Sequence, residues 1–208
     1  MAALVGAALL PAMAAAQSET APAQSNSPDI DEGERLVHNL DCDVCHTPKA
    51  MTPAGPLPDA SRRLSGHPAG EALPPLPEGV LGADGWGGLF NLHLTAWAGP
   101  WGVSFGSNLT PDEETGIGAW SEELFVESMR TGTHVGDLRP FLPPMPTYSR
   151  LTDGELHAIF TYLQSIEPIS NEVPAPLPPR SAPSGSRAAS QPTADSPWPP
   201  STTKNSSR

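Results

Sequence analysis

The chain has 208 residues, with 27 prolines, 19 glycines, 2 cysteines and a formal net charge of −12. This length suits one domain with tails, or two very small domains. The acidic charge is repelled by phosphate backbones and argues against a nucleic-acid partner. No apolar run reaches the roughly 18 residues that a membrane-spanning helix needs. Two cysteines are too few for a disulfide scaffold or, by themselves, for a structural zinc site.

The two ends of the chain differ in composition from its middle. Residues 1–16 are rich in alanine, carry no charged side chain and end on small residues that fit an A-x-A cleavage rule, which predicts a secretory signal peptide. Residues 17–28 are expected to form a disordered linker. Residues 173–208 hold 9 Pro and 8 Ser; they bury too little apolar surface to offset the entropy of ordering, which predicts a disordered tail. One ordered domain remains, at residues 29–172.

Three stretches of this domain have a helical pattern. Apolar residues of the stretch from about Asp29 to Leu40 fall on one stripe at helical spacing. A second helix is expected from about Glu122 to Arg130, between good capping residues. A third is expected from about Asp153 to Ser165, where Thr152 and Glu155 match the T-x-x-E capping box. The remaining chain is rich in Pro and Gly and lacks convincing strand alternation, so we expect long irregular loops and a thin apolar core.

Residues Cys42-Asp43-Val44-Cys45-His46 form a C-x-x-C-H motif. Two thiols one helical turn apart can add to the two vinyl groups of one porphyrin, and the adjacent His then lies beneath the iron. This spacing is typical of c-type haem attachment. The motif therefore predicts one covalent haem c, with Cys42 and Cys45 as attachment residues and His46 as an axial ligand of the iron.

Other uses of two cysteines fit the sequence less well. A thioredoxin-like C-x-x-C follows a strand in a βαβ unit, whereas this one follows a predicted helix. Zinc would need two more ligands, and the other histidines are scattered without an H-x-x-x-H pair. Haem attachment is therefore the favoured interpretation of the motif.

Haem iron takes a second axial ligand or leaves a vacancy. Met145 lies in a loop stiffened by prolines, which can hold a thioether at the iron, so we predict Met145 as this ligand; the alternative is a methionine that fills a gap. Met51 is too close to His46 in sequence to reach the opposite haem face. Met129 lies on an apolar helical stripe and is expected in the core. His134 is the next candidate ligand.

The order of these features resembles the class I cytochrome c family: helix, C-x-x-C-H, irregular middle, helix, Pro-Met loop and helix. The block from Asn108 to Trp120, with its N-L-T-P-D and T-G-I-G segments, is similar to one found in bacterial exported cytochromes c, including haem subunits of periplasmic dehydrogenases. The resemblance covers about residues 29–174. It implies an all-α class I cytochrome c fold, with three main helices around one haem. The chain departs from compact members of the family by an expected loop insertion at about residues 66–106.

The resemblance also gives roles to individual residues. Gly33 would let the terminal helices cross closely, against Phe160 or Tyr162. The carbonyl of Pro56 would accept a hydrogen bond from the second ring nitrogen of His46.

We expect an exported, periplasmic electron carrier that cycles Fe(II)/Fe(III) and has no catalytic residue. Its partners would be redox proteins such as a periplasmic dehydrogenase or a terminal oxidase. One alternative is a haem sensor or ligand-binding cytochrome with an open or labile sixth site. A second is the electron-accepting subunit of a dehydrogenase complex. An enzyme such as a peroxidase is less favoured, because di-haem peroxidases carry two haem motifs and this chain has one.

Overall fold

The structure, a computed structural model, describes residues 28–81, 85–136 and 138–179. The predicted signal peptide, almost all of the predicted linker and most of the predicted tail lie outside these residues. The described part of the chain contains four α-helices, α1 (Pro28–Asn39), α2 (Cys42–His46), α3 (Glu122–Thr131) and α4 (Asp153–Ser165). The three longer helices begin and end within one residue of their predicted limits. The short helix α2 is formed by the C-x-x-C-H motif itself.

The prediction of an all-α class I cytochrome c fold is wrong, because the described residues also contain three small antiparallel sheets. One pairs β1 (Lys49–Thr52) with β2 (Gly55–Pro58), and another pairs β6 (Thr133–His134) with β7 (Arg139–Pro140). The third has the order β3 (Leu89–Phe90), β4 (Ala96–Gly99), β5 (Gly102–Phe105). A single turn of 3-10 helix, η1, covers Ala60–Arg62.

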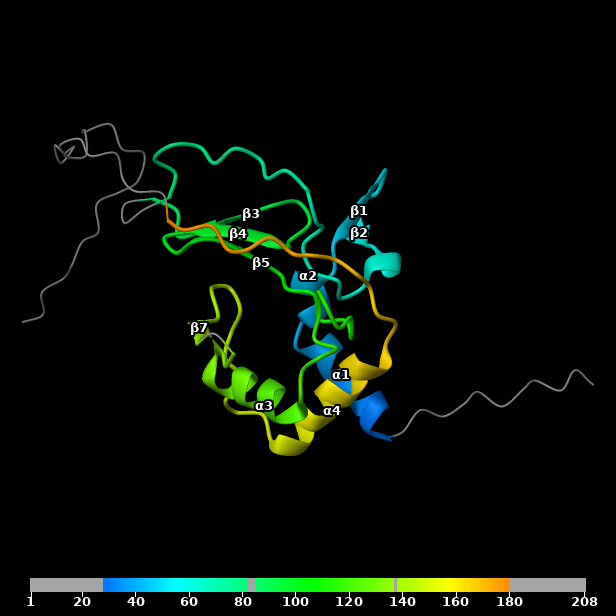
Figure 1. Ribbon diagram of the computed structural model, residues 1–208. Helices are drawn as coiled ribbons and strands as arrows, with labels where there is room; N and C mark the ends of the chain where they lie inside the picture. Colours follow the sequence, from blue (N-terminus) through cyan, green and yellow to red (C-terminus); the bar gives the residue numbers. More distant parts are fainter. Residues whose placement is uncertain (1–27, 82–84, 137, 180–208) are drawn as a thin grey trace, which may run out of the picture.

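The three-stranded sheet arises from the inserted segment that we expected to be an irregular loop. Gly99 pairs with Gly102 at the turn between β4 and β5, and Gly102 has a φ of 101° that side-chain-bearing residues rarely adopt. Ala98 and Val103 are buried on the two paired strands. Figure 1 shows this sheet on one side of the molecule and α1, α3 and α4 on the other.

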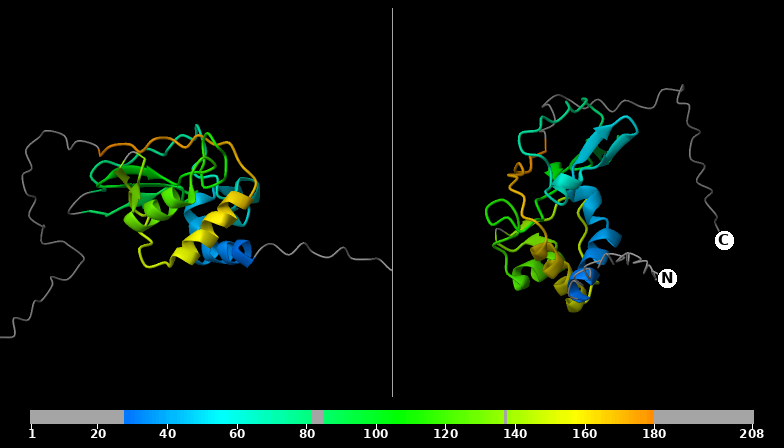
Figure 2. Two further views of the ribbon diagram at one scale, coloured as in Figure 1. Left: turned by 60° about the horizontal axis from the view of Figure 1, so that its bottom comes forward. Right: turned by 90° about the vertical axis from the view of Figure 1, so that its right-hand side faces the viewer.

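Helices α1 and α4 pack across each other, as Figure 2 shows, and Gly33 on α1 lies directly against α4. A Cβ atom added at Gly33 would overlap the carbonyl oxygen of Ala158 and would lie 2.6 Å from the Cβ atom of Tyr162. The prediction of a close crossing at Gly33 is therefore confirmed, with Tyr162 as its aromatic neighbour. The crossing belongs to the main core, which also includes Leu36, Val37, Phe125, Met129, Leu156, Ile159 and Leu163.

The predicted capping residues act as expected. Thr152 Oγ1 accepts a hydrogen bond from the Glu155 amide at 3.2 Å, and Glu155 Oε2 accepts one from the Thr152 amide at 2.7 Å. Ser121 Oγ accepts a hydrogen bond from the Leu124 amide at 3.2 Å. These contacts satisfy amides that the first helical turn leaves without partners and so fix where α3 and α4 begin.

After α4 the chain runs back across the molecule as an extended strap, residues 166–179. The Asn171 side-chain amide donates to the carbonyls of Ser65 and His67, at 2.6 and 2.9 Å. Leu177 and Val103 exchange two backbone hydrogen bonds of 2.9 Å, so the described start of the predicted tail lies against β5. Among the described residues, no helix has both the length and the apolar character needed to cross a membrane.

Candidate cofactor site

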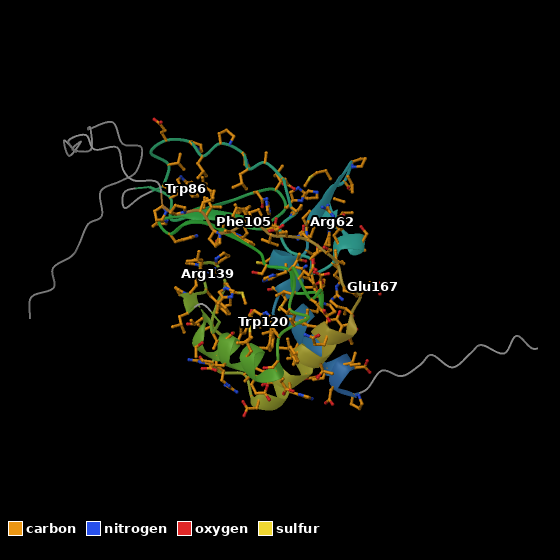
Figure 3. The ribbon with its side chains drawn as sticks, in the orientation of Figure 1. Arg62, Trp86, Phe105, Trp120, Arg139 and Glu167 are labelled. Carbon is orange, nitrogen blue, oxygen red and sulfur yellow. The ribbon has the colours of Figure 1, made fainter. Side chains whose placement is uncertain are left out.

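An apolar cavity of about 310 Å³ lies between the helices and the β3–β5 sheet, within the size range of small-molecule and cofactor sites. Its walls come from α2, β5, α3, α4 and the Pro-rich loop before α4. In Figure 3, the labelled Phe105, Trp120 and Arg139 come from three different parts of the chain around it. Most of its lining is aromatic or aliphatic, including Leu40, Trp97, Leu109, Phe125, Phe141, Ile159 and Leu163.

Both cysteines of the motif line this cavity as free thiols. They are three residues apart on α2, so they lie on the same face of one helical turn. Burial, with the nearby charge of Asp43, raises the pKa of Cys42 to about 12. Burial also raises the pKa of Cys45, and the charge of Lys49 opposes this effect. The geometry therefore presents two neutral thiols to the same apolar space.

His46 ends α2 and is only 7% exposed. Its Nδ1 atom lies 2.8 Å from the carbonyl oxygen of Ser107. Because a carbonyl only accepts, Nδ1 carries the proton, and Nε2 keeps the lone pair that a metal ligand needs. Burial lowers the pKa of His46 against the opposing effects of this hydrogen bond and of Asp43, which favours the neutral ring.

The prediction that the Pro56 carbonyl accepts this hydrogen bond is wrong. Pro56 lies exposed on β2, opposite Met51, and does not line the cavity. The Ser107 carbonyl is the acceptor instead, because the chain that follows β5 passes next to the end of α2. Sequence analysis missed Ser107, since a backbone acceptor has no side-chain signature; the only signal was its position just before the Asn108 block.

Two glycines allow this close approach of β5 to the motif. A Cβ atom at Gly106 would overlap the carbonyl oxygen of Cys45. The Gly66 amide donates to the His46 carbonyl at 2.7 Å, and a Cβ atom there would lie 2.5 Å from the carbonyl oxygen of Gly106. Because neither position has room for a side chain, the backbone at Gly66 and Gly106 packs directly against the Cys45–His46 end of α2.

The Asn108 block has a structural role beside the cavity. The Asn108 side-chain oxygen accepts hydrogen bonds from the amide and the hydroxyl of Thr110, at 3.0 and 2.7 Å. Its side-chain nitrogen donates to the Ile169 carbonyl at 2.7 Å and to Thr115 Oγ1 at 3.1 Å. Asn108 therefore joins the loop that carries Ser107 to the strap after α4.

Met145 lines the same cavity as the two thiols and His46. Its loop is held from two sides. Ser104 Oγ on β5 donates to the Pro143 carbonyl, and the Tyr148 amide donates to the Met129 carbonyl on α3 at 2.9 Å. The structure thus brings together all four residues predicted to attach or ligate a haem.

Two of the three competing ligand candidates lie at the same cavity as Met145, and the third, Met51, does not. Met129 and His134 also line the cavity, but Met129 is 7% exposed within the core, and the His134 ring packs edge-on against Phe141 at 5.0 Å. Met51 is 53% exposed on β1 and does not line the cavity. Over the described ranges, no group of three His, Cys, Asp or Glu side chains is arranged to hold a metal ion.

No protein-family model matches the chain. It is 37% identical over 91 residues to a nicotinate dehydrogenase subunit of Pseudomonas putida, and the match covers 43% of this chain and 8% of that protein. It is 26% identical over 162 residues to the gluconate 2-dehydrogenase cytochrome c subunit of Pantoea cypripedii, with 74% of this chain and 28% of that protein covered. It is 25% identical over 162 residues to the fructose dehydrogenase cytochrome subunit of Gluconobacter japonicus, with 76% of this chain and 25% of that protein covered.

These matches confirm that the chain resembles cytochrome c subunits of dehydrogenases. The chain spans less than a third of the length of each of these three relatives.

Proposed function

We propose that this chain is an electron-transfer protein that holds one haem c in the cavity, attached through Cys42 and Cys45. One observation carries the proposal: the two thiols and the imidazole of the C-x-x-C-H motif open onto one apolar cavity, which Met145 also lines. The similarity to cytochrome c subunits supports the same class of function.

The residues around the cavity fit a haem c. Two thiols one turn apart match covalent attachment through two vinyl groups. A neutral His46, whose Nδ1 proton is held by the Ser107 carbonyl at 2.8 Å, matches the usual arrangement of a metal-binding histidine. Aromatic and aliphatic walls suit the porphyrin faces, and sulfur from methionine is an established haem ligand.

Each residue then has a defined task. When bound, haem c supplies a one-electron Fe(II)/Fe(III) couple. Cys42 and Cys45 would tether the porphyrin through thioether bonds, and His46 and Met145 would ligate the iron. A methionine ligand would raise the reduction potential. The apolar walls would limit the access of water to the cofactor, which also bears on the potential. We assign no catalytic residue.

The partner we propose is a dehydrogenase whose electrons this chain accepts, either as a free periplasmic carrier or as a subunit. The similarity to dehydrogenase subunits supports this choice, and export fits the covalent haem chemistry and the leader-like residues 1–16. The net charge of −12 would attract a partner with a basic docking face, and the attraction would weaken as salt rises.

Absorption spectra of the protein, expressed with cytochrome c maturation machinery, test this proposal. The expected result is a low-spin c-type spectrum with a far-red sulfur-to-iron band and no change when CO is added to the reduced protein. The pigment should stay with the polypeptide after denaturation, and a Cys42→Ser, Cys45→Ser double variant should lose it. Rapid CO binding or a high-spin ferric spectrum would instead indicate a ligand-binding haem protein. Absence of covalent haem would overturn the whole proposal.

A further inference from the structure

Lys49 is a buried lysine next to the attachment motif. It begins β1, three residues after His46, and is 7% exposed. Lysine is almost never fully buried unless its ammonium has partners. Its burial therefore needs an explanation, and neither the attachment of a haem nor its ligation provides one.

The partners of Lys49 are the carbonyls at the end of α2. Its Nζ atom donates to the Val44 carbonyl at 2.9 Å and to the Thr47 carbonyl. The last carbonyls of a helix lack intrahelical partners and carry partial negative charge. An ammonium has three donors and no acceptor, so it suits a site made of carbonyl oxygens.

The backbone of Lys49 is fixed from the other side. Its amide donates to Nδ1 of His93 at 3.0 Å, and Nε2 of His93 lies 3.2 Å from Oε1 of Glu71. These contacts fix the backbone from which the Lys49 side chain extends.

The charge of Lys49 lies beside the attachment residue Cys45. Its ammonium donates to the Val44 carbonyl at 2.9 Å, and this carbonyl belongs to the peptide bond that joins Val44 to Cys45. Burial lowers the pKa of Lys49 itself, while Cys45 and Asp43 oppose that effect. Arg63 already compensates Asp43 through two hydrogen bonds of 2.9 Å. A positive charge is thus left at the C-terminal end of α2, next to the backbone of Cys45, the residue that would carry the haem.

We propose that Lys49 is a positioning residue that caps the attachment helix and raises the reduction potential of the haem, an inference that rests on the proposed function. A fixed positive charge favours the less positive Fe(II) form over Fe(III), and the interaction is stronger in a partly buried site than in water. Capping keeps Cys45 and His46 in register with the cavity.

Midpoint potentials of three variants of the haem-loaded protein separate charge from hydrogen bonding. Lys49→Gln keeps N–H donors but removes the charge, and its potential should shift below that of the wild type. Lys49→Arg keeps the charge and should hold a potential close to wild type. Lys49→Met removes both and should also lower the yield of covalent haem. Arg62→Gln, which removes a cation on η1 that is 40% exposed and 2.8 Å from Asp59, is the control and should leave the potential unchanged.

A Lys49→Gln potential equal to wild type, or a Lys49→Arg potential that falls as far as that of Lys49→Gln, overturns the inference. Thermal unfolding of the haem-loaded proteins tests the cap separately: the capping role requires Lys49→Met to melt below wild type, and equal melting temperatures overturn it. Failure of the proposed function is distinguishable, because it would show as a wild-type protein without covalent haem.

Discussion

The Nδ1 atom of His46 lies 2.8 Å from the carbonyl oxygen of Ser107, a residue 61 positions later in the chain. This hydrogen bond joins α2 to the end of β5, so the orientation of the imidazole depends on the inserted segment that forms the sheet. Gly106 makes the approach possible, because any side chain there would meet the Cys45 carbonyl.

Gly106→Ala is expected to push Ser107 away from His46, because the added Cβ atom would overlap the carbonyl oxygen of Cys45. Loss of the partner that orients a metal-binding histidine typically costs about 10–100-fold in metal affinity or activity. We therefore expect a fall in covalent haem per polypeptide, measured from the pyridine haemochrome spectrum. Gly136→Ala is the control, since a Cβ atom there meets nothing within 4 Å. Equal haem content in both variants would contradict this role of Gly106.

The parts of the site that sequence analysis could predict are those specified by side chains close together in the sequence. The C-x-x-C-H spacing identifies Cys42, Cys45 and His46 by itself, and capping residues locate the ends of α3 and α4. The sheet could not be predicted, because its strands have only two to four residues and too little alternation to detect. The Ser107 carbonyl could not be predicted either, since its place depends on tertiary contacts between backbone segments.

Met145→Ala directly tests the proposal that Met145 is a ligand of the haem iron. Loss of the thioether should open a coordination position, so the reduced protein should bind CO rapidly, lose the far-red sulfur-to-iron band and have a lower midpoint potential. Met129→Leu conserves volume in the core and should keep the band. Met51→Ala, at a position 53% exposed, should match wild type in CO binding, in the far-red band and in midpoint potential. A band that survives Met145→Ala but disappears in Met129→Leu would assign the ligand to Met129 instead.

Acid should destabilise the folded domain through His67. This ring is fully buried; its Nδ1 atom lies 2.9 Å from Thr95 Oγ1, and its Nε2 atom has no hydrogen-bond partner among the described residues. Burial lowers its pKa, Glu71 opposes that effect, and His93 adds to it. Because the unfolded chain then binds the proton more readily, the stabilisation is present above the ordinary histidine pKa of about 6.5 and is lost as pH falls toward the lower folded-state value.

Denaturant unfolding of the haem-loaded protein between about pH 7.5 and 5.5 measures this effect. One such histidine changes the unfolding free energy by at most about 1.4 kcal/mol per pH unit. His67→Gln should reduce the dependence of the unfolding free energy on pH. His38→Gln, at an exposed position on α1, should leave this dependence unchanged. A slope that His67→Gln does not alter would assign the acid sensitivity to other groups.

Gly33→Ala tests the close packing of α1 against α4, the helix that contributes Ile159 and Leu163 to the lining of the cavity. The added Cβ atom would overlap the Ala158 carbonyl oxygen and lie 2.6 Å from Tyr162 Cβ, so the helices must separate. Overpacking of this kind costs about 1–3 kcal/mol, against at most about 1 kcal/mol that alanine gains over glycine in a helix. Thermal unfolding should therefore show a lower melting temperature.

The matched control for this substitution is Gly154→Ala on α4, where a Cβ atom meets nothing within 4 Å. There only the helix propensity changes, so the melting temperature should stay level or rise. A melting temperature that falls for Gly33→Ala but not for Gly154→Ala would show that Gly33 is required for close packing rather than for backbone flexibility. If Gly33→Ala stabilised the protein as Gly154→Ala does, the two helices could not be in such close contact.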